Sequence, residues 1–228
     1  MLRFGNDALF VCARDTGMFV SFFSLMLVLS LLRGRDRAGR PPLPILAFTV
    51  AGVLFLAWDG MTSYLGLRES TNVIRFLSGF AAGAGLAFLA ASLVNGFVFA
   101  GDRSKRVGSR PSDIAAAILV GGAAVVLFLL RPAYLFRLGQ IWLLLSMLGT
   151  FWILNLLLIY LVSRKKVEGL TVGRAAMAAA LTVVVLAGAY WLHRLLAGGG
   201  PTPIRPVPGA EAGWGPPILA GIQRGSPV

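Results

Sequence analysis

Long apolar stretches separated by short hydrophilic segments make up most of this chain. A helix needs about 20 mainly apolar residues to cross the hydrocarbon core of a bilayer, and somewhat fewer suffice when its ends lie in the interface. Six stretches reach that length. They cover approximately residues 16–32, 43–58, 73–100, 114–131, 138–163 and 171–196. The pattern predicts an all-α protein, an integral membrane bundle of about six transmembrane helices within residues 1–197.

The last segment, residues 198–228, has a different composition. It begins with three glycines and a proline and contains seven of the twelve prolines in the chain. A segment so rich in glycine and proline buries too little apolar surface to fold alone, so we expect a flexible tail. Trp214 and the apolar run at 216–219 leave a second interpretation open, in which the tail touches the membrane interface or a partner.

The composition supports a membrane location and excludes other classes of protein. Of the 228 residues, 57% are apolar and only 13% are charged, whereas soluble domains carry about 25% charged residues. One cysteine and one histidine cannot supply the ligands of a usual zinc cluster, and a single cysteine cannot form an internal disulfide. We therefore predict no metal and no other cofactor.

Basic residues concentrate in alternate loops. The segments that follow the first and third spans each carry four lysines or arginines. The segment after the fifth span carries three, and Arg174 at the start of the sixth span brings the total to twelve of the chain's twenty-one. Short basic loops stay in the cytoplasm, so we predict a bacterial inner (plasma) membrane protein with both termini outside. The basic run after the first span also indicates an uncleaved anchor rather than a signal peptide.

The excess of basic residues also bears on partners. Basic loops beside a bilayer are attracted to anionic lipid, so the net charge of +12 requires no nucleic acid. The lipid bilayer is the expected partner, and anionic lipid or other membrane subunits are further candidates.

Two polar clusters lie on the predicted outer side. The first, CARDTG at residues 12–17, stands directly before the first span. The second begins with Asp-Gly at 59–60, where the second span ends, and continues as RESTNVIR at 68–75. Ser70 or Thr71 is a suitable N-cap for the third helix, because a hydroxyl there can accept a bond from an unpaired backbone N–H.

The third predicted helix carries a stripe of polar and small residues. Spacings of three and four residues place the members of this stripe on one helix face. They are Asn72, Arg75, Gly79 and Gly83. Because Gly79 and Gly83 form a GxxxG pair, which lets another helix approach closely, the stripe is expected to face protein. In the fifth helix, we expect Asn155 to bond across to a neighbouring helix.

Charge pairing is expected within these clusters. An arginine at the depth of Arg75 needs a counter-charge or water. Asp59 ends the second helix, where the macrodipole is already negative, so a cation is expected beside it, either Arg75 or Arg14. Asp15 opens the first helix, where an acidic side chain is favoured, and its simplest role is that of an N-cap.

The first functional interpretation is a binding protein without chemistry of its own. The outward-facing helix N-termini and the arginines would hold an anionic headgroup or a phosphorylated ligand. The expected ligand-binding residues are Arg14, Arg68, Asn72 and Arg75. The expected supporting residues are Cys12, Asp15, Asp59, Ser70 and Thr71.

Two other interpretations use the same residues differently. In one, the polar clusters only pin helices together, and the protein is a structural or accessory subunit of a membrane complex. In the other, Cys12 is a nucleophile activated by Arg14 and assisted by His193. Because a lone histidine at a helix end is more often an interfacial residue, we assign no catalytic residue and no enzymatic activity.

The two clusters resemble a family of predicted bacterial and archaeal multi-pass membrane proteins of unknown function. In that family Cys-x-Arg-Cys-Thr-Gly opens a transmembrane helix, and an Asp-Gly precedes Arg-x-Ser/Thr-Asn-x-x-Arg and a glycine-rich helix. The resemblance covers roughly residues 2–85 and implies no particular activity. The positions it marks are Cys12, Arg14, Asp59, Arg68, Asn72 and Arg75.

This chain departs from the family pattern in two ways. Asp15 stands where the family has its second cysteine, so a redox or metal role of the family's thiols does not carry over. The family's upstream Cys-His segment has no counterpart here. Either this member lacks that segment, or its natural start lies upstream of Met1.

Overall fold

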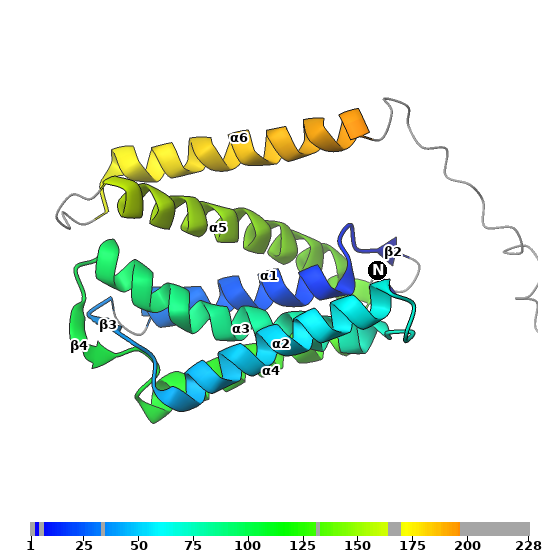
Figure 1. The fold of residues 1–228 in the computed structure, drawn as a ribbon, viewed down its shortest axis with the longest axis horizontal. Coiled ribbons are helices and arrows are strands. Elements are labelled where there is room, and N and C mark those ends of the chain that lie inside the picture. Colours follow the sequence, from blue (N-terminus) through cyan, green and yellow to red (C-terminus); the bar gives the residue numbers. More distant parts are fainter. Residues whose placement is uncertain (1–2, 5–6, 33–34, 131–132, 164–169, 197–228) are drawn as a thin grey trace, which may run out of the picture. The chain divides into compact units, whose positions relative to one another are not determined.

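The computed structural model describes the chain except for residues 1–2, 5–6, 33–34, 131–132, 164–169 and 197–228. In the described part, six helices are long and apolar enough to cross a membrane, which confirms the predicted all-α bundle (Figure 1). They are α1 (Ala13–Met26), continued by the π-helix η1 (Leu27–Leu32), α2 (Leu43–Tyr64), α3 (Asn72–Phe97), α4 (Pro111–Leu130), α5 (Phe136–Ser163) and α6 (Val172–Leu196). A short 3-10 helix, η2 (Ala133–Leu135), precedes α5. The predicted tail, 198–228, lies outside the described residues.

Two small sheets lie outside the long helices. The strands β1 (Arg3–Phe4) and β2 (Asp7–Ala8) pair antiparallel before α1. The strands β3 (Arg37–Gly39) and β4 (Asp102–Arg106) pair in parallel, and they connect the basic segments that follow the first and third helices. Both basic segments therefore lie at the same end of the α1–α3 pair (Figure 1). Hydropathy did not predict this pairing, because it depends on α1 and α3 ending side by side.

The helices α1 and α3 form the buried centre of the fold. They approach so closely that a Cβ atom would overlap the backbone of the facing helix at three glycines. The facing pairs are Gly17 with Phe76, Gly79 with Arg14, and Gly83 with Met18. The GxxxG pair of α3 thus packs on α1, the kind of close crossing that small residues permit.

The helices α2, α4 and α5 pack against this pair and expose apolar side chains. On α2, for example, Leu43, Val50 and Leu54 are exposed, while Gly52 packs on the backbone of Ala81 in α3. An exposed apolar surface of this kind suits contact with lipid chains. The α2–α3 packing also brings the C-terminal end of α2 beside the N-terminal end of α3.

The chain divides into two compact units, Met1–Val185 and Leu186–Val228. The first unit contains the candidate site described below. In the second unit, the described residues are the last turns of α6, where the guanidinium carbon of Arg194 lies 5.6 Å from the centre of the Tyr190 ring.

Candidate functional site

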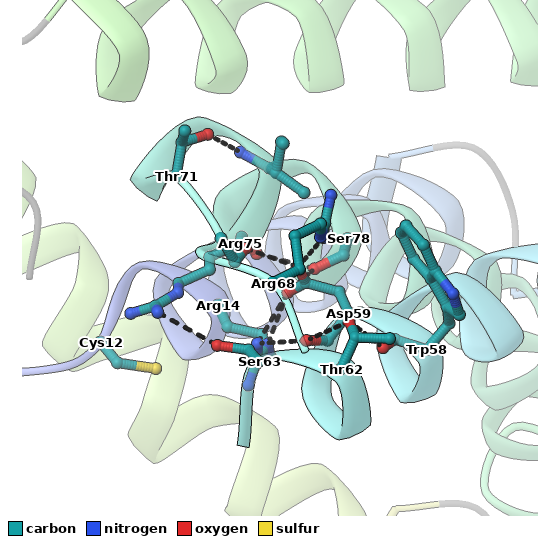
Figure 2. Close-up of polar contacts among 12 residues, drawn as sticks. Cys12, Arg14, Trp58, Asp59, Thr62, Ser63, Arg68, Thr71, Arg75 and Ser78 are labelled. Carbon is teal, nitrogen blue, oxygen red and sulfur yellow. Dashed lines mark hydrogen bonds and ion pairs between the residues drawn. The ribbon is translucent and has the colours of Figure 1, made fainter. Parts of the chain in front are cut away.

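A single carboxylate organises the polar residues at the start of α1 and α3. Asp59 lies near the C-terminal end of α2, and its side chain is completely buried. A buried carboxylate is stable only when it is paired and hydrogen-bonded. The contacts of its two oxygens therefore define the site (Figure 2).

The Oδ2 atom of Asp59 is bound from α1 and from α3. Arg14 donates to it from Nη2 at 2.7 Å and from Nε at 3.2 Å. The same Nη2 also lies 3.3 Å from the main-chain oxygen of Asp59. Ser78 of α3 donates its hydroxyl to Oδ2 at 3.3 Å, or to the main-chain oxygen of Arg75 at 3.0 Å. Two of the three guanidinium nitrogens of Arg14 are thus directed to Asp59.

The Oδ1 atom is bound from the segment between α2 and α3. Arg68 donates from Nη2 at 2.9 Å, and Ser70 donates its hydroxyl at 2.6 Å. The guanidinium of Arg68 also lies over the ring of Trp58, 4.4 Å from its centre, which is a favourable cation–π position. We call Arg14, Asp59, Arg68, Ser70 and Ser78 the Asp59 network. It ties α1, α2, α3 and the connecting segment to one carboxylate (Figure 2).

Arg75 does not pair with Asp59 among the described residues. We expected either Arg75 or Arg14 to neutralise this carboxylate, and the structure gives that role to Arg14 and Arg68. Arg75 instead donates from Nη2 to the hydroxyl of Ser63 at 3.2 Å. The reason is position along the helix: Arg75 lies in the first turn of α3, beside the end of α2, whereas Ser78 is the residue that reaches the carboxylate.

Three arginines lie close to one buried carboxylate. Arg14 and Arg68 bind Asp59 directly, and Arg75 lies in the first turn of α3 beside them. We call Arg14, Arg68 and Arg75 the arginine cluster; the acidic side chains of Asp15 and Glu69, in the same two polar segments, are not buried. In the part of the chain that the structure describes, the Nε atoms of Arg68 and Arg75 are buried and have no hydrogen-bond partner. The N-termini of α1 and α3 add partial positive charge at the same end. Asn72 is the first residue of α3 and is half-buried.

Cys12, not Asp15, is the N-cap of α1. The Cys12 sulfur accepts a bond from the backbone N–H of Asp15 at 3.4 Å and donates to the Asp15 carboxylate at 2.9 Å. Asp15 is the third residue of α1, and its carboxylate accepts from the Cys12 thiol, whereas the third residue of a capping box accepts from the backbone N–H of the cap. Thr71 caps α3 by accepting from the backbone N–H of Ile74 at 3.3 Å. Of the two predicted caps of α3, Thr71 has this role and Ser70 bonds Asp59.

The surroundings of Cys12 oppose nucleophilic chemistry. Burial raises the pKa of the Cys12 thiol above its ordinary value, and the bond to the Asp15 carboxylate raises it further. A reactive cysteine needs the opposite shift, because the thiolate is the nucleophile. His193 belongs to the second compact unit.

The remaining predicted residue acts elsewhere. Asn155 of α5 donates to the Thr182 hydroxyl of α6 at 3.0 Å, a bond across neighbouring helices. Three residues of the site, Trp58, Ser63 and Ser78, were not predicted. Ser78 alone had a signal, since it adjoins Gly79 on a helix whose small residues face protein.

The arrangement is better suited to an anion than to a cation. Among the described residues, no three histidine, cysteine, aspartate or glutamate side chains gather in a possible metal site. The atoms without partners are guanidinium donors, which match the oxygens of phosphate or carboxylate groups.

Comparison with known proteins gives a family match and two uncharacterised relatives. The pattern of a family described as "Predicted membrane protein (DUF2085)" matches residues 1–89. An uncharacterised protein of Methanothermobacter thermautotrophicus is 39% identical over 83 residues, which are 35% of this chain and 67% of that protein. An uncharacterised protein of Methanocaldococcus jannaschii is 32% identical over 78 residues, 34% of this chain and 48% of that protein. No solved structure gives a significant match.

Proposed function

Because the chain belongs to the DUF2085 family of predicted membrane proteins, we propose that its arginine cluster works at a membrane surface, where it binds an anionic group. The group would be a phosphate, either free, on a small ligand or in a lipid headgroup. The family match at residues 1–89 contains every residue of the cluster and of the Asp59 network. The positive-inside pattern favours the outer surface for this site.

The observation that carries this proposal is the pair of buried, unpartnered Nε atoms in Arg68 and Arg75. Buried polar groups in native proteins normally have a partner. Here they belong to two guanidiniums beside a carboxylate, that of Asp59, whose oxygens already accept from other donors. An anion that accepted from both Nε atoms would satisfy these donors.

The roles of the arginines differ in this proposal. Arg14 is a positioning residue, because its Nε and Nη2 atoms are directed to Asp59. Arg75 would be the main donor to the anion, and Arg68 would contribute the atoms that Asp59 does not use. Asn72 is the first residue of α3 and lies on the same helix face as Arg75, three residues later. Its side chain would therefore contact the anion or the adjoining segment.

Native mass spectrometry of the protein, extracted gently from its own membrane, tests the proposal. We expect a stoichiometric small adduct on the wild type, and its mass would distinguish a lipid from a small phosphorylated ligand. Charge-assisted hydrogen bonds contribute about 1.5–3 kcal/mol each, so Arg75→Gln should weaken the adduct about tenfold or more. Arg137→Gln removes an exposed charge from the first turn of α5 and is the matched control.

The contrary results are equally clear. An adduct that persists unchanged in Arg75→Gln, or is lost equally in Arg137→Gln, would exclude the arginine cluster as the binding site. The unfolding temperature of each variant shows whether a loss reflects misfolding. Binding of inorganic phosphate and of glycerol phosphate to the delipidated protein then separates a free phosphate from a headgroup.

A second candidate function is that of a structural or accessory subunit. The saturation of Asp59 by donors from α1, α3 and the connecting segment favours it, since such a network stabilises helix packing without any ligand. In this case residues 198–228 would dock the partner. Deleting them should release a co-purified protein and leave the small adduct unaffected, whereas the anion-binding proposal alone predicts no co-purified protein to lose.

A further inference from the structure

A second candidate site lies at the end of the fold that carries β3. A cavity of about 540 Å³ is bounded by α1, η1, α3, α5 and α6. Its wall is almost entirely apolar, and it shares no residue with the Asp59 network. Side chains of four of these elements illustrate the wall: Phe23, Leu27, Leu148, Trp152, Leu156 and Ala179. The volume lies in the range of about 300–1,000 Å³ that is typical of small-molecule sites.

Two hydroxyl side chains line this apolar wall, those of Ser30 and Thr182. The Thr182 hydroxyl is already bonded, because it accepts from Asn155 and donates to the main-chain oxygen of Ala178. Ser30 is 4% exposed, lines the cavity, and its Oγ atom has no hydrogen-bond partner in the described part of the chain. It lies in the π-helix Leu27–Leu32, and such wide turns occur often at functional sites. Because buried hydroxyls normally find a partner, an acceptor inside the cavity would account for this one.

The cavity also has one charged lining residue. Arg35 is exposed, and its guanidinium carbon lies 4.6 Å from the centre of the Phe99 ring, which also lines the cavity. Among the described residues no carboxylate forms an ion pair with Arg35. Its position two residues before β3 places this charge at the basic end of the fold, where an anionic headgroup would be attracted.

The charge, the hydroxyl and the apolar wall follow one another in order along the chain. Reading back from Arg35, the lining residues are the charged side chain, then the Ser30 hydroxyl, then the apolar Leu27 and Phe23. An amphiphile with an anionic head, a carbonyl group and a long apolar chain has the same order of chemistry. Protein interiors are normally close-packed and leave few large apolar voids. An acyl chain from the bilayer would fill this cavity.

We infer that this cavity binds one acyl chain of an anionic glycerophospholipid. The lipid phosphate contacts Arg35, an ester carbonyl accepts the hydrogen bond of Ser30, and the chain runs along Leu27 and Phe23 towards α5. This site is distinct from the arginine cluster, since it takes the apolar part of the lipid and lies at the other end of α1.

The first test fills the cavity. The purified, delipidated Arg75→Gln protein, in which the arginine cluster is weakened, is titrated with palmitoyl-oleoyl phosphatidylglycerol and bound lipid is counted by native mass spectrometry. Ala179→Phe places a ring in the cavity and should weaken binding at least tenfold. Ala180→Phe is the matched control, because Ala180 is exposed on the same helix and does not line the cavity. Equal binding by the two variants would overturn the assignment.

The second test examines the headgroup and the hydroxyl. The wild-type protein should bind phosphatidylglycerol more tightly than phosphatidylcholine with the same chains, and Arg35→Gln should remove that preference. Arg40→Gln, a change at an exposed arginine of the same segment outside the cavity, should retain it. Ser30→Ala should weaken both lipids by a similar factor.

These polar variants also decide the question if Ala179→Phe does not fold. Equal affinity of the wild type for the two lipids would refute a site that is selective for an anionic headgroup, because both lipids carry a phosphate and differ in net charge. If Ser30→Ala and Arg35→Gln, each tested alone, both bind phosphatidylglycerol as tightly as the wild type, the site as a whole is refuted. Loss of binding in Arg75→Gln compared with the wild type would instead assign the lipid to the arginine cluster.

Discussion

Gly79 of α3 lies directly against the backbone of Arg14 in α1, so that a Cβ atom at Gly79 would overlap the Arg14 carbonyl oxygen. The side chain of the same arginine binds Asp59. The closest point of the helix crossing and the central ion pair therefore share one residue. The spacing of α1 and α3 at Gly79 decides whether the Arg14 guanidinium reaches the carboxylate.

Replacing Gly79 should consequently disturb both the packing and the ion pair. Gly79→Ala forces α1 away from α3, and overpacking of this kind costs about 1–3 kcal/mol. Gly122→Ala in α4 is the control, because no atom lies within 4 Å of its added Cβ, and it should be neutral or stabilise by up to about 1 kcal/mol. Free energies of unfolding in detergent micelles measure both. Equal values for the two variants would contradict the close crossing.

The pairing of Asp59 can be measured by double-mutant cycles. Removing one partner of a buried ion pair costs about 3–5 kcal/mol, so Asp59→Asn should be strongly destabilising. Combined with Arg14→Gln, it should show a coupling energy of about 1–3 kcal/mol. The corresponding cycle with Arg75→Gln should be additive, because Arg75 bonds Ser63. A larger coupling to Arg75 than to Arg14 would refute the arrangement.

The reactivity of Cys12 should follow its contact with Asp15. Burial and the Asp15 carboxylate both raise the thiol pKa, so alkylation by iodoacetamide should be slow at neutral pH and should rise only at alkaline pH. Asp15→Asn removes the carboxylate's charge and should move the rate profile to lower pH. Because the thiol pKa is raised in the folded protein, the protonated thiol stabilises the folded state. This contribution to the free energy of unfolding is lost as the pH rises through the thiol pKa of the folded protein. An unchanged profile in Asp15→Asn would argue that burial alone sets it.

The predicted orientation in the membrane is testable by reporter fusions. If the basic segments are cytoplasmic, alkaline phosphatase fused after Leu67 should be active in a bacterial host, because that position is outside. The same enzyme fused after Ser109 should be inactive. The opposite pair of results would place the arginine cluster at the cytoplasmic surface.

Residue spacing and hydropathy predicted the helices and part of the site. The second span was predicted to end near residue 58, and α2 extends to Tyr64. Ser63, the partner of Arg75, therefore lies within the helix. The cap of α3 at Thr71 and the face of Gly79 followed from local rules, because caps and helix faces depend on residues a few positions apart. These features need no knowledge of the tertiary fold.

The pairing within the site could not be predicted in the same way. The choice among Arg14, Arg68 and Arg75 as partners of Asp59 depends on how α1 and α3 sit against the end of α2. The sequence predicted Arg14 or Arg75 as the partner of Asp59 and did not predict Arg68, which the structure pairs with the same carboxylate. The cavity beside Ser30 was missed for a similar reason, because its wall comes from elements distant in the chain.

The parallel pairing of β3 with β4 has a consequence for biogenesis. The strand β3 leaves the ribosome directly after the first helix, but its partner β4 follows the third. The donors Arg68, Ser70 and Ser78 also reach Asp59 only after α2 is complete. A nascent chain that holds just α1 and α2 thus has an unpaired strand at one end and a carboxylate with only Arg14 at the other. Synthesis of α3 and β4 supplies the missing strand and the missing donors to Asp59. The α1–α2 pair therefore reaches its native contacts only when the third helix has been inserted.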